Sequence, residues 1–239
     1  MNNIYRILII LIVVVIVYNL LSWYFQKSSK LTSGVSKGTE EQTIQASSLA
    51  NSSQSSNYSY SLWFYVSDWN YRFGQSKTIL SRNDQNDEPC PSIALGSMKN
   101  NLEISVACYP TSSTDEDSTS VIHTCNVYNI PIQKWVHLAI SLNGQNLDVY
   151  IDGKLSKTCV LEGVAKVNPE ANVSVTPNGG FSGWTSTVKY YDTEINPQEA
   201  YNLYKAGYAG KGLLGQLFGQ YKLRVQVMKD GETGTSFEI

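Results

Sequence analysis

Apolar and polar positions alternate along residues 135–142 and again along residues 147–151. Strict alternation over this length is typical of a β-strand that buries one face. Turn-forming residues at positions 143–146 separate the two runs, so the pattern predicts an antiparallel hairpin. Asp152 and Gly153, which accept the positive φ angles of a tight turn, then send the chain back into a third strand. The stretch therefore predicts a three-stranded meander.

Further strand patterns follow one another through the rest of the chain, separated by residues that favour turns. These patterns cover residues 43–46, 58–66, 77–82, 90–95, 102–108, 121–128, 173–175, 181–191, 221–229 and 233–239. Trp184 is expected to anchor the core. One short helix is predicted at residues 197–206, because Asn196 is suited to cap its start and Gly207 to end it. The predicted fold class is all-β, an antiparallel β-sandwich.

The N-terminal pattern is different, because residues 4–25 are almost wholly apolar. About 20 such residues, at a helical rise of about 1.5 Å each, cover the roughly 30 Å hydrocarbon core of a bilayer. The aromatic and basic residues that mark the ends of membrane spans are Tyr5, Arg6, Trp23, Tyr24, Lys27 and Lys30. A cleaved signal peptide is the alternative, although the run ends in bulky residues unsuited to cleavage. The pattern predicts one N-terminal transmembrane α-helix, with the lipid bilayer as a partner.

The chain is thereby divided into three parts. Residues 1–27 are the predicted transmembrane anchor. Residues 28–42 are predicted to be a polar stalk, because residues 28–57 are rich in Ser, Thr, Gln, Asn and Gly, which bury too little apolar surface to order themselves. Residues 43–239 are the predicted sandwich domain.

Several segments of this pattern resemble a known family. They are Ile130-Pro131, Gln133, Trp135, His137 and residues 147–154, together with residues 63–74 and 196–207. They are similar to laminin-G-like or concanavalin A-like jelly-roll domains, especially membrane-anchored members encoded by large nucleocytoplasmic DNA viruses, some of which look like minor capsid or virion membrane proteins. The resemblance covers residues 43–239 and implies a jelly roll. It also implies a single-pass protein between an internal virion membrane and the capsid, with other capsid proteins as partners.

Four cysteines lie in the predicted sandwich. The turn at residues 99–101 folds its flanking strands so that Cys90 lies nearly opposite Cys108, close to disulfide reach. Cys125 and Cys159 then pair by elimination. A zinc site is one alternative, but the spacings contain no C-x2-C or H-x3-H element. Free, buried thiols are the other alternative.

Composition adds one preference and one exclusion. The 16 Tyr and 17 Gly favour strands and turns. The formal net charge is -2 and the sequence pI is about 5.7. Nucleic acid is bound by a basic stripe of Lys and Arg, and this charge balance provides none. We therefore expect no nucleic-acid partner.

Residues suited to catalysis or cofactor binding are sparse. Glycosidases of this fold carry an E-x-D-x-x-E strand, and this chain has none. Asp148 and Asp152 share a strand face without a glutamate partner, and His137 is expected to be structural. We expect no enzymatic activity and no cofactor. Calcium at the acidic run of residues 115–117 is the alternative, although that run is expected to be a solvated loop tip.

The candidate contacts for a glycan or protein partner are Trp69, Tyr71, Arg72, His137 and Tyr150. In an exposed loop, the first three would form a stacking platform for a sugar. The other interpretation, which is the one expected, is that Trp69 plugs one open end of the sandwich. N-glycosylation sequons, used only if the domain enters the secretory lumen, begin at Asn51, Asn57 and Asn172.

Taken together, these patterns predict a non-enzymatic, membrane-anchored structural or interaction protein. The resemblance specifies a minor capsid or virion membrane protein that links an internal membrane to the capsid. The alternative is a membrane-anchored, lectin-like module that binds glycans.

Overall fold

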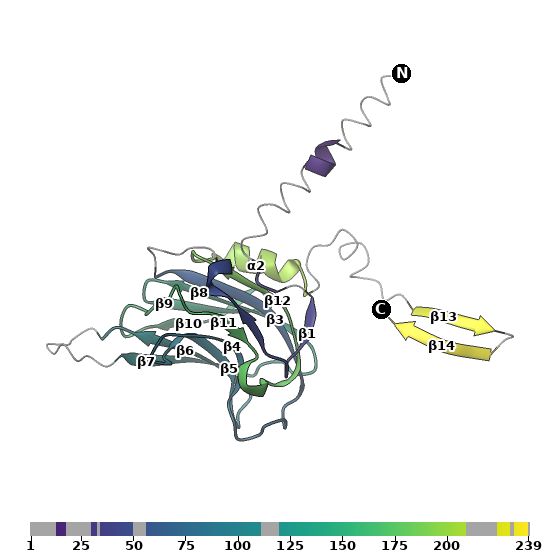
Figure 1. The fold of residues 1–239 in the computed structure, drawn as a ribbon, viewed down its shortest axis with the longest axis horizontal. Coiled ribbons are helices and arrows are strands. Elements are labelled where there is room, and N and C mark those ends of the chain that lie inside the picture. Colours follow the sequence, from purple (N-terminus) through teal and green to yellow (C-terminus); the bar gives the residue numbers. More distant parts are fainter. Residues whose placement is uncertain are drawn as a thin grey trace, which may run out of the picture.

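The computed structural model describes residues 13–17, 30–32, 34–49, 56–110 and 120–208, and the backbone of residues 224–229 and 232–238. Two six-stranded antiparallel sheets pack face to face within it (Figure 1). The all-β antiparallel sandwich predicted from the alternating pattern is confirmed.

Each sheet is built from strands that are far apart in the sequence. Sheet A contains, in spatial order, β1 (Val35–Lys37), β12 (Ser182–Tyr191), β3 (Tyr58–Asp68), β8 (Trp135–Asn143), β9 (Asn146–Ile151) and β10 (Lys154–Val160). Sheet B contains β2 (Gln42–Ile44), β11 (Val173–Val175), β4 (Lys77–Asn83), β5 (Pro89–Leu95), β6 (Asn101–Cys108) and β7 (Val121–Tyr128). Outside the two sheets lie two short 3-10 helices, η1 (Ala46–Ser48) and η2 (Pro177–Gly179), and the α-helix α2 (Pro197–Lys205). The predicted last hairpin is formed by β13 (Arg224–Lys229) and β14 (Glu232–Glu238).

The core lies between the sheets, and the predicted meander lines it. β8 pairs with β9 and β9 with β10, both antiparallel, as predicted. The inward side chains of β8, which are at most 1% exposed, are Val136, Leu138, Ile140 and Leu142. Removing such apolar surface from water, at roughly 25 cal/mol per Å², is the main force that holds the two sheets together.

Trp184 does not anchor the core as predicted, because it lies on the outer face of sheet A and is 40% exposed. Val188 and Tyr190 of the same strand are buried in the core, and simple alternation would put Trp184 beside them. A register shift between Ser186 and Lys189 reverses the faces of the strand. The shift arises from one extra residue in β12, and an analysis of alternating positions cannot detect such a residue.

One open edge of the sandwich is closed by the segment predicted to be a stalk. β1 pairs with β12 in sheet A, and β2 pairs with β11 in sheet B, so residues 35–44 cross from one sheet to the other. Lys30 already bridges to Lys189. The sandwich therefore begins about a dozen residues before the predicted boundary. A short edge strand is held by backbone hydrogen bonds more than by buried apolar side chains. The polar composition of residues 28–42 therefore did not reveal that this segment joins the sheets.

The opposite edge is closed by a disulfide. Cys125 of β7 and Cys159 of β10 are bonded, and these strands are the edge strands of the two sheets. The predicted Cys90–Cys108 disulfide is absent, because both residues are free, buried thiols. The pairing of β5 with β6 ends at Ser92 opposite Ser105, before either cysteine is reached. An extra residue in β5 between Pro89 and Ser92 also shifts the register there, whereas the predicted disulfide assumed an unbroken register.

The predicted membrane span lies mostly outside the described residues. Its described part, residues 13–17, is helical. Within the described ranges, no helix is long and apolar enough to cross a membrane. The transmembrane anchor stays a prediction from the sequence.

The predicted short helix is confirmed as α2 (Pro197–Lys205), and it covers part of the outer face of sheet A (Figure 1). Asn196 and Glu199 form a capping box, in which each side chain accepts a hydrogen bond from the other's backbone N–H. The helix buries a small second cluster formed by Ala139, Tyr150, Ile195 and Ala200. Its Tyr204 stacks on Trp63 of β3, with ring centroids 5.7 Å apart.

His137 lies on this covered face and is 1% exposed. Its Nε2 and Ser61 Oγ are hydrogen bonded at 2.9 Å, and its ring packs against Trp63 at 5.2 Å. Burial lowers the pKa of His137 to about 4, because the charged imidazolium would lose its water; the nearby Asp152 carboxylate offsets only part of that cost. His137 is therefore neutral and structural at physiological pH.

Replacing Cys125 and Cys159 together by Ala is expected to lower the free energy of unfolding by about 2–4 kcal/mol, because the bond spans 34 residues of chain. Urea unfolding with and without reductant measures the loss. The matched control replaces Cys90 and Cys108 by Ala, and its unfolding should stay sensitive to reductant. Peptide mapping that finds Cys90 or Cys108 in a disulfide would contradict the assignment.

Stability is expected to fall as the pH drops from about 6.5 toward 4, because His137 has a lower pKa in the folded chain than in the unfolded chain, which then binds more protons. The shift corresponds to roughly 3 kcal/mol across that window. Urea unfolding at stepped pH should give a shallower dependence for His137→Gln than for the parent chain. The control His123→Gln should keep the parent dependence, and equal slopes for all three proteins would refute this role of His137.

Candidate functional site

The loop candidates Trp69, Tyr71 and Arg72 hold the fold together rather than face solvent. Trp69 packs against the core, and Lys77 Nζ lies 4.9 Å from the centre of its ring. Tyr71 Oη donates to the carbonyl of Gly179 at 3.0 Å, and the Arg72 guanidinium donates to the carbonyl of Asn178. These bonds attach the β3–β4 loop to η2, and Trp69 lies partly buried against the core.

The other two candidates are buried elsewhere. His137 and Tyr150 are each 1% exposed and lie on the part of sheet A that α2 covers. Tyr150 Oη donates to the Asp148 carboxylate at 3.4 Å. The five predicted contact residues therefore do not form one surface, and these two are inaccessible to a ligand.

The sequons differ in what their asparagines do. The Asn57 side chain accepts a hydrogen bond from the backbone of Gly144 at 2.9 Å and donates to Glu194 at 3.0 Å. The Asn172 side chain accepts from the backbone of Ala46 at 2.9 Å. Asn51 lies outside the described residues, as does the acidic run at 115–117 that was the calcium candidate.

The Ser61–His137 pair does not extend into a catalytic triad. Asp152 is the nearest acidic group in the turn beside it, but its Oδ1 accepts the backbone N–H of His137 at 2.9 Å. Within the described residues, Nδ1 of the ring has no hydrogen-bond partner. A catalytic histidine is normally oriented through that nitrogen, so this pair is better explained as packing.

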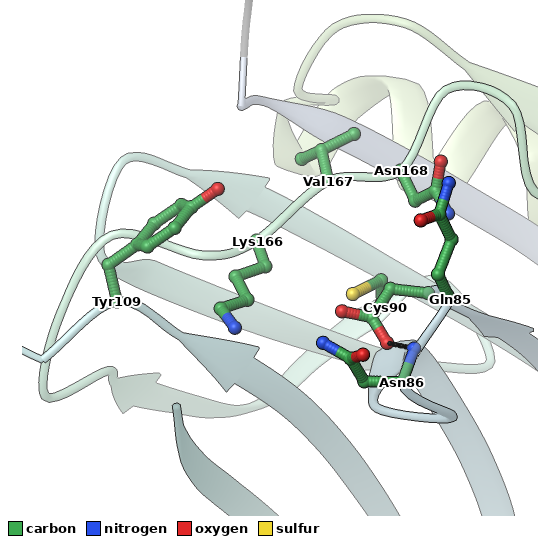
Figure 2. A pocket seen from close by; sticks show the side chains of 8 residues that line it. Gln85, Asn86, Cys90, Tyr109, Lys166, Val167 and Asn168 are labelled. Carbon is green, nitrogen blue, oxygen red and sulfur yellow. Dashed lines mark hydrogen bonds between the residues drawn. The ribbon is translucent and has the colours of Figure 1, made fainter. Parts of the chain in front are cut away.

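A polar pocket of about 280 Å³ opens at the end of sheet B where β4 turns into β5 (Figure 2). Three elements meet there: the β4–β5 turn, the chain just after β6, and the connection that precedes β11. The lining residues are Asp84, Gln85, Asn86, Cys90, Tyr109, Lys166, Val167 and Asn168. Figure 2 shows Tyr109 and Lys166 on one side of the hollow, with Gln85 and Asn168 on the other in that view.

Charges around the pocket are largely paired. Lys166 Nζ lies 2.8 Å from the Glu88 carboxylate, and this hydrogen bond raises the pKa of Lys166. Partial burial alone would raise the pKa of Asp84, but backbone N–H bonds from Glu88 and Asn86 bring it below the usual range. The Asp84 carboxylate is therefore ionised, and both carboxylates are already engaged in hydrogen bonds.

The pocket has features of a binding site and lacks those of a reactive one. Burial raises the pKa of the Cys90 thiol to about 11, so its nucleophilic thiolate is scarce at neutral pH. Among the described residues, no group of three or more His, Cys, Asp or Glu side chains is arranged to hold a metal ion. The amide side chains and Tyr109, which is 57% exposed, offer hydrogen-bonding groups beside an aromatic ring.

A second exposed feature, which sequence reasoning missed, is an aromatic row on the outer face of sheet A. Trp184, Tyr65 and Trp135 are direct cross-strand partners on β12, β3 and β8. Tyr208 stacks on Trp135 with ring centroids 4.6 Å apart. The three strand residues stand at outward positions, and the pairing of β3 with both β12 and β8 places them in a row.

Comparison with solved structures finds the same fold in toxin binding domains. The binding domain of botulinum neurotoxin DC in complex with rat synaptotagmin II has a TM-score of 0.51 and 19% identity, over 70% of this chain and 40% of that chain. The same domain in complex with SialylT has a TM-score of 0.51 and 17% identity, over 70% and 39%. The receptor binding domain of the botulinum neurotoxin C/D mosaic serotype has a TM-score of 0.51 and 16% identity, over 72% and 41%.

These values establish the fold alone, and this chain spans about two-fifths of each toxin chain. No curated protein matches the sequence. A laminin-G-type family model, described as the concanavalin A-like lectin/glucanases superfamily, matches residues 37–200. That match covers both sheets from β2 to the start of α2. The chain therefore belongs to the concanavalin A-like lectin/glucanase superfamily.

Proposed function

We propose that this chain is a non-catalytic recognition module, tethered to a membrane by its N-terminal span, that binds an uncharged glycan in the polar pocket beside Tyr109. The observation that carries this proposal is the gathering of three amide side chains and an exposed aromatic ring around one hollow of about 280 Å³. That volume is near the lower end of small-molecule sites, which are roughly 300–1,000 Å³, and it suits one or two sugar rings.

The lining chemistry matches what a sugar presents. Sugar hydroxyls both donate and accept hydrogen bonds, and Gln85, Asn86 and Asn168 each offer a carbonyl acceptor and an NH2 donor. The Tyr109 ring offers an apolar face to the C–H side of a pyranose. Lys166, the one cation among the lining residues that the structure describes, is already paired with Glu88, so an uncharged ligand is favoured over an anionic one.

Binding is favoured over hydrolysis by the state of the carboxylates. A glycosidase needs one carboxylic acid with a raised pKa to protonate the leaving group. The pKa of Asp84 is instead lowered, and Glu88 accepts hydrogen bonds from Lys166 and Ser120. Neither group is set up as an acid. Membership of a superfamily that includes lectins is consistent with a binding role. The toxin domain of the same fold in complex with SialylT is consistent with it too, although that complex is of another protein.

The minor capsid role stays a prediction that rests on the sequence resemblance. Its test is a map of purified particles: density for the sandwich between membrane and shell would support it, and absence of the protein from particles would refute it. A tethered glycan-binding module is compatible with either result.

Tyr109→Ala is expected to weaken glycan binding about fivefold or more, because loss of an aromatic contact costs roughly 1 kcal/mol. The full-length chain in detergent is first screened on a glycan array, and the best uncharged ligand is then titrated against each variant. The matched control is Tyr128→Ala, since Tyr128 is 59% exposed and lines a different pocket. No uncharged glycan bound on the array, or a loss with Tyr128→Ala but not Tyr109→Ala, would contradict the proposed site.

A further inference from the structure

The aromatic row is an exposed surface that the core does not require. Trp184 and Tyr208 are 40% and 41% exposed, Tyr65 and Trp135 are half-buried, and all four lie outside both buried clusters. Val35 of β1 is 51% exposed and stands two residues from Lys37, the cross-strand partner of Trp184, so it shares this face. The strand pairing thus places an apolar, aromatic surface at one side of the outer face of sheet A.

The row lies far from the polar pocket. The β3–β4 loop joins the end of β3 to the start of β4, and the pocket begins where β4 ends. Tyr65 is near the end of β3, so the row and the pocket stand toward opposite ends of the sandwich. A partner bound along the row would leave the pocket open.

The connection to the predicted span identifies the partner. The span ends at residue 25, and Lys30 already bridges to Lys189 of β12, the strand that carries Trp184. Residues 26–30 reach at most about 18 Å when fully extended. With the span inserted, Lys189 is held within that distance of the bilayer surface, and Trp184 lies five residues along the same strand, roughly 17 Å further. The tether therefore keeps the outer face of β12 near the membrane at a high effective concentration.

We propose that the aromatic row, formed by Tyr65, Trp135, Trp184 and Tyr208, rests in the interfacial region of the lipid bilayer in which the span is inserted. Tryptophan and tyrosine are enriched at this depth, because their rings are apolar while their N–H and O–H groups reach water. The inference rests on the membrane tether of the proposed function and goes beyond it, because it assigns a second contact and an orientation. The pocket then faces away from the membrane.

Charge around the row indicates which lipids are needed. Lys37 pairs with Glu40 at 3.1 Å, and Lys134 pairs with Asp152 at 3.5 Å. The two lysines that neighbour Trp184 and Trp135 are therefore each paired with a carboxylate, so their attraction to anionic lipid contributes little. Zwitterionic phosphatidylcholine should suffice for the contact.

The test uses the full chain in phosphatidylcholine vesicles, with lipids brominated at a shallow acyl position as quenchers of tryptophan fluorescence. Of the five tryptophans, Trp23 reports the span, and Trp135 and Trp184 report the row. The controls are Trp63, which is buried, and Trp69, which is partly buried against the core. In a Trp23→Phe background, brominated lipid is expected to quench part of the emission. That quenched part should shrink with Trp135→Phe and again with Trp184→Phe, and stay unchanged with Trp69→Phe.

The result separates failure of the row from failure of the tether. Quenching of Trp23 with none at Trp135 or Trp184 would overturn the inference and leave the tether standing. No quenching of Trp23 would refute the tether and the inference together, without touching the glycan pocket. Glycan binding that is lost with Trp135→Phe or Trp184→Phe would assign the row to glycans and overturn the inference.

A second measurement avoids substitutions within the row. An environment-sensitive fluorophore is attached at Lys37→Cys, beside Trp184, or at Glu170→Cys, near the pocket; both positions are exposed, and the native free thiols are buried. On insertion into vesicles, the emission at position 37 should shift to shorter wavelength and be quenched by brominated lipid, while that at position 170 stays unchanged. Equal responses at the two positions would contradict the proposed orientation.

Discussion

Face-to-face packing of two antiparallel sheets is the constraint on which the rest of this structure depends. Every long strand must turn one apolar face inward, as β8 does with its alternate residues. Closing the core also requires both open edges to be covered. At one edge the chain itself crosses from β1 to β2, and at the other Cys125–Cys159 joins β7 to β10. At one end, Trp69 of the β3–β4 loop packs against the core.

Once the core is satisfied, what remains exposed carries the functional argument. α2 covers part of the outer face of sheet A and buries His137 there, so that histidine is explained by packing. Another part of this face carries the aromatic row, which packing does not require. The polar pocket lies at the other end of the sandwich, where paired charges and amide groups favour recognition over acid–base chemistry. The simplest arrangement that uses both features is a domain that rests on a membrane by its aromatic row and presents its polar pocket to a ligand.

Local signals in the sequence predicted local structure well. The meander was readable because its strands are adjacent and period-2, and α2 because Asn196 and Glu199 form its capping box within three residues. Errors arose where distant segments decide the outcome. The register shift in β12 moved Trp184 outward, and an extra residue in β5 beside Cys90 broke the register that the predicted Cys90–Cys108 bond assumed. Neither the pocket nor the aromatic row was foreseen, because each joins strands or loops separated by many residues that no periodicity connects.

The central claim is that recognition takes place at the polar pocket. The most direct measurement is a crystal structure of the chain with an uncharged oligosaccharide selected by array screening. We expect a sugar ring against Tyr109, with hydroxyls hydrogen bonded to Asn86 or Asn168, and unchanged Lys166–Glu88 pairing. Sugar density on Trp135 and Trp184, with an empty pocket, would contradict the claim.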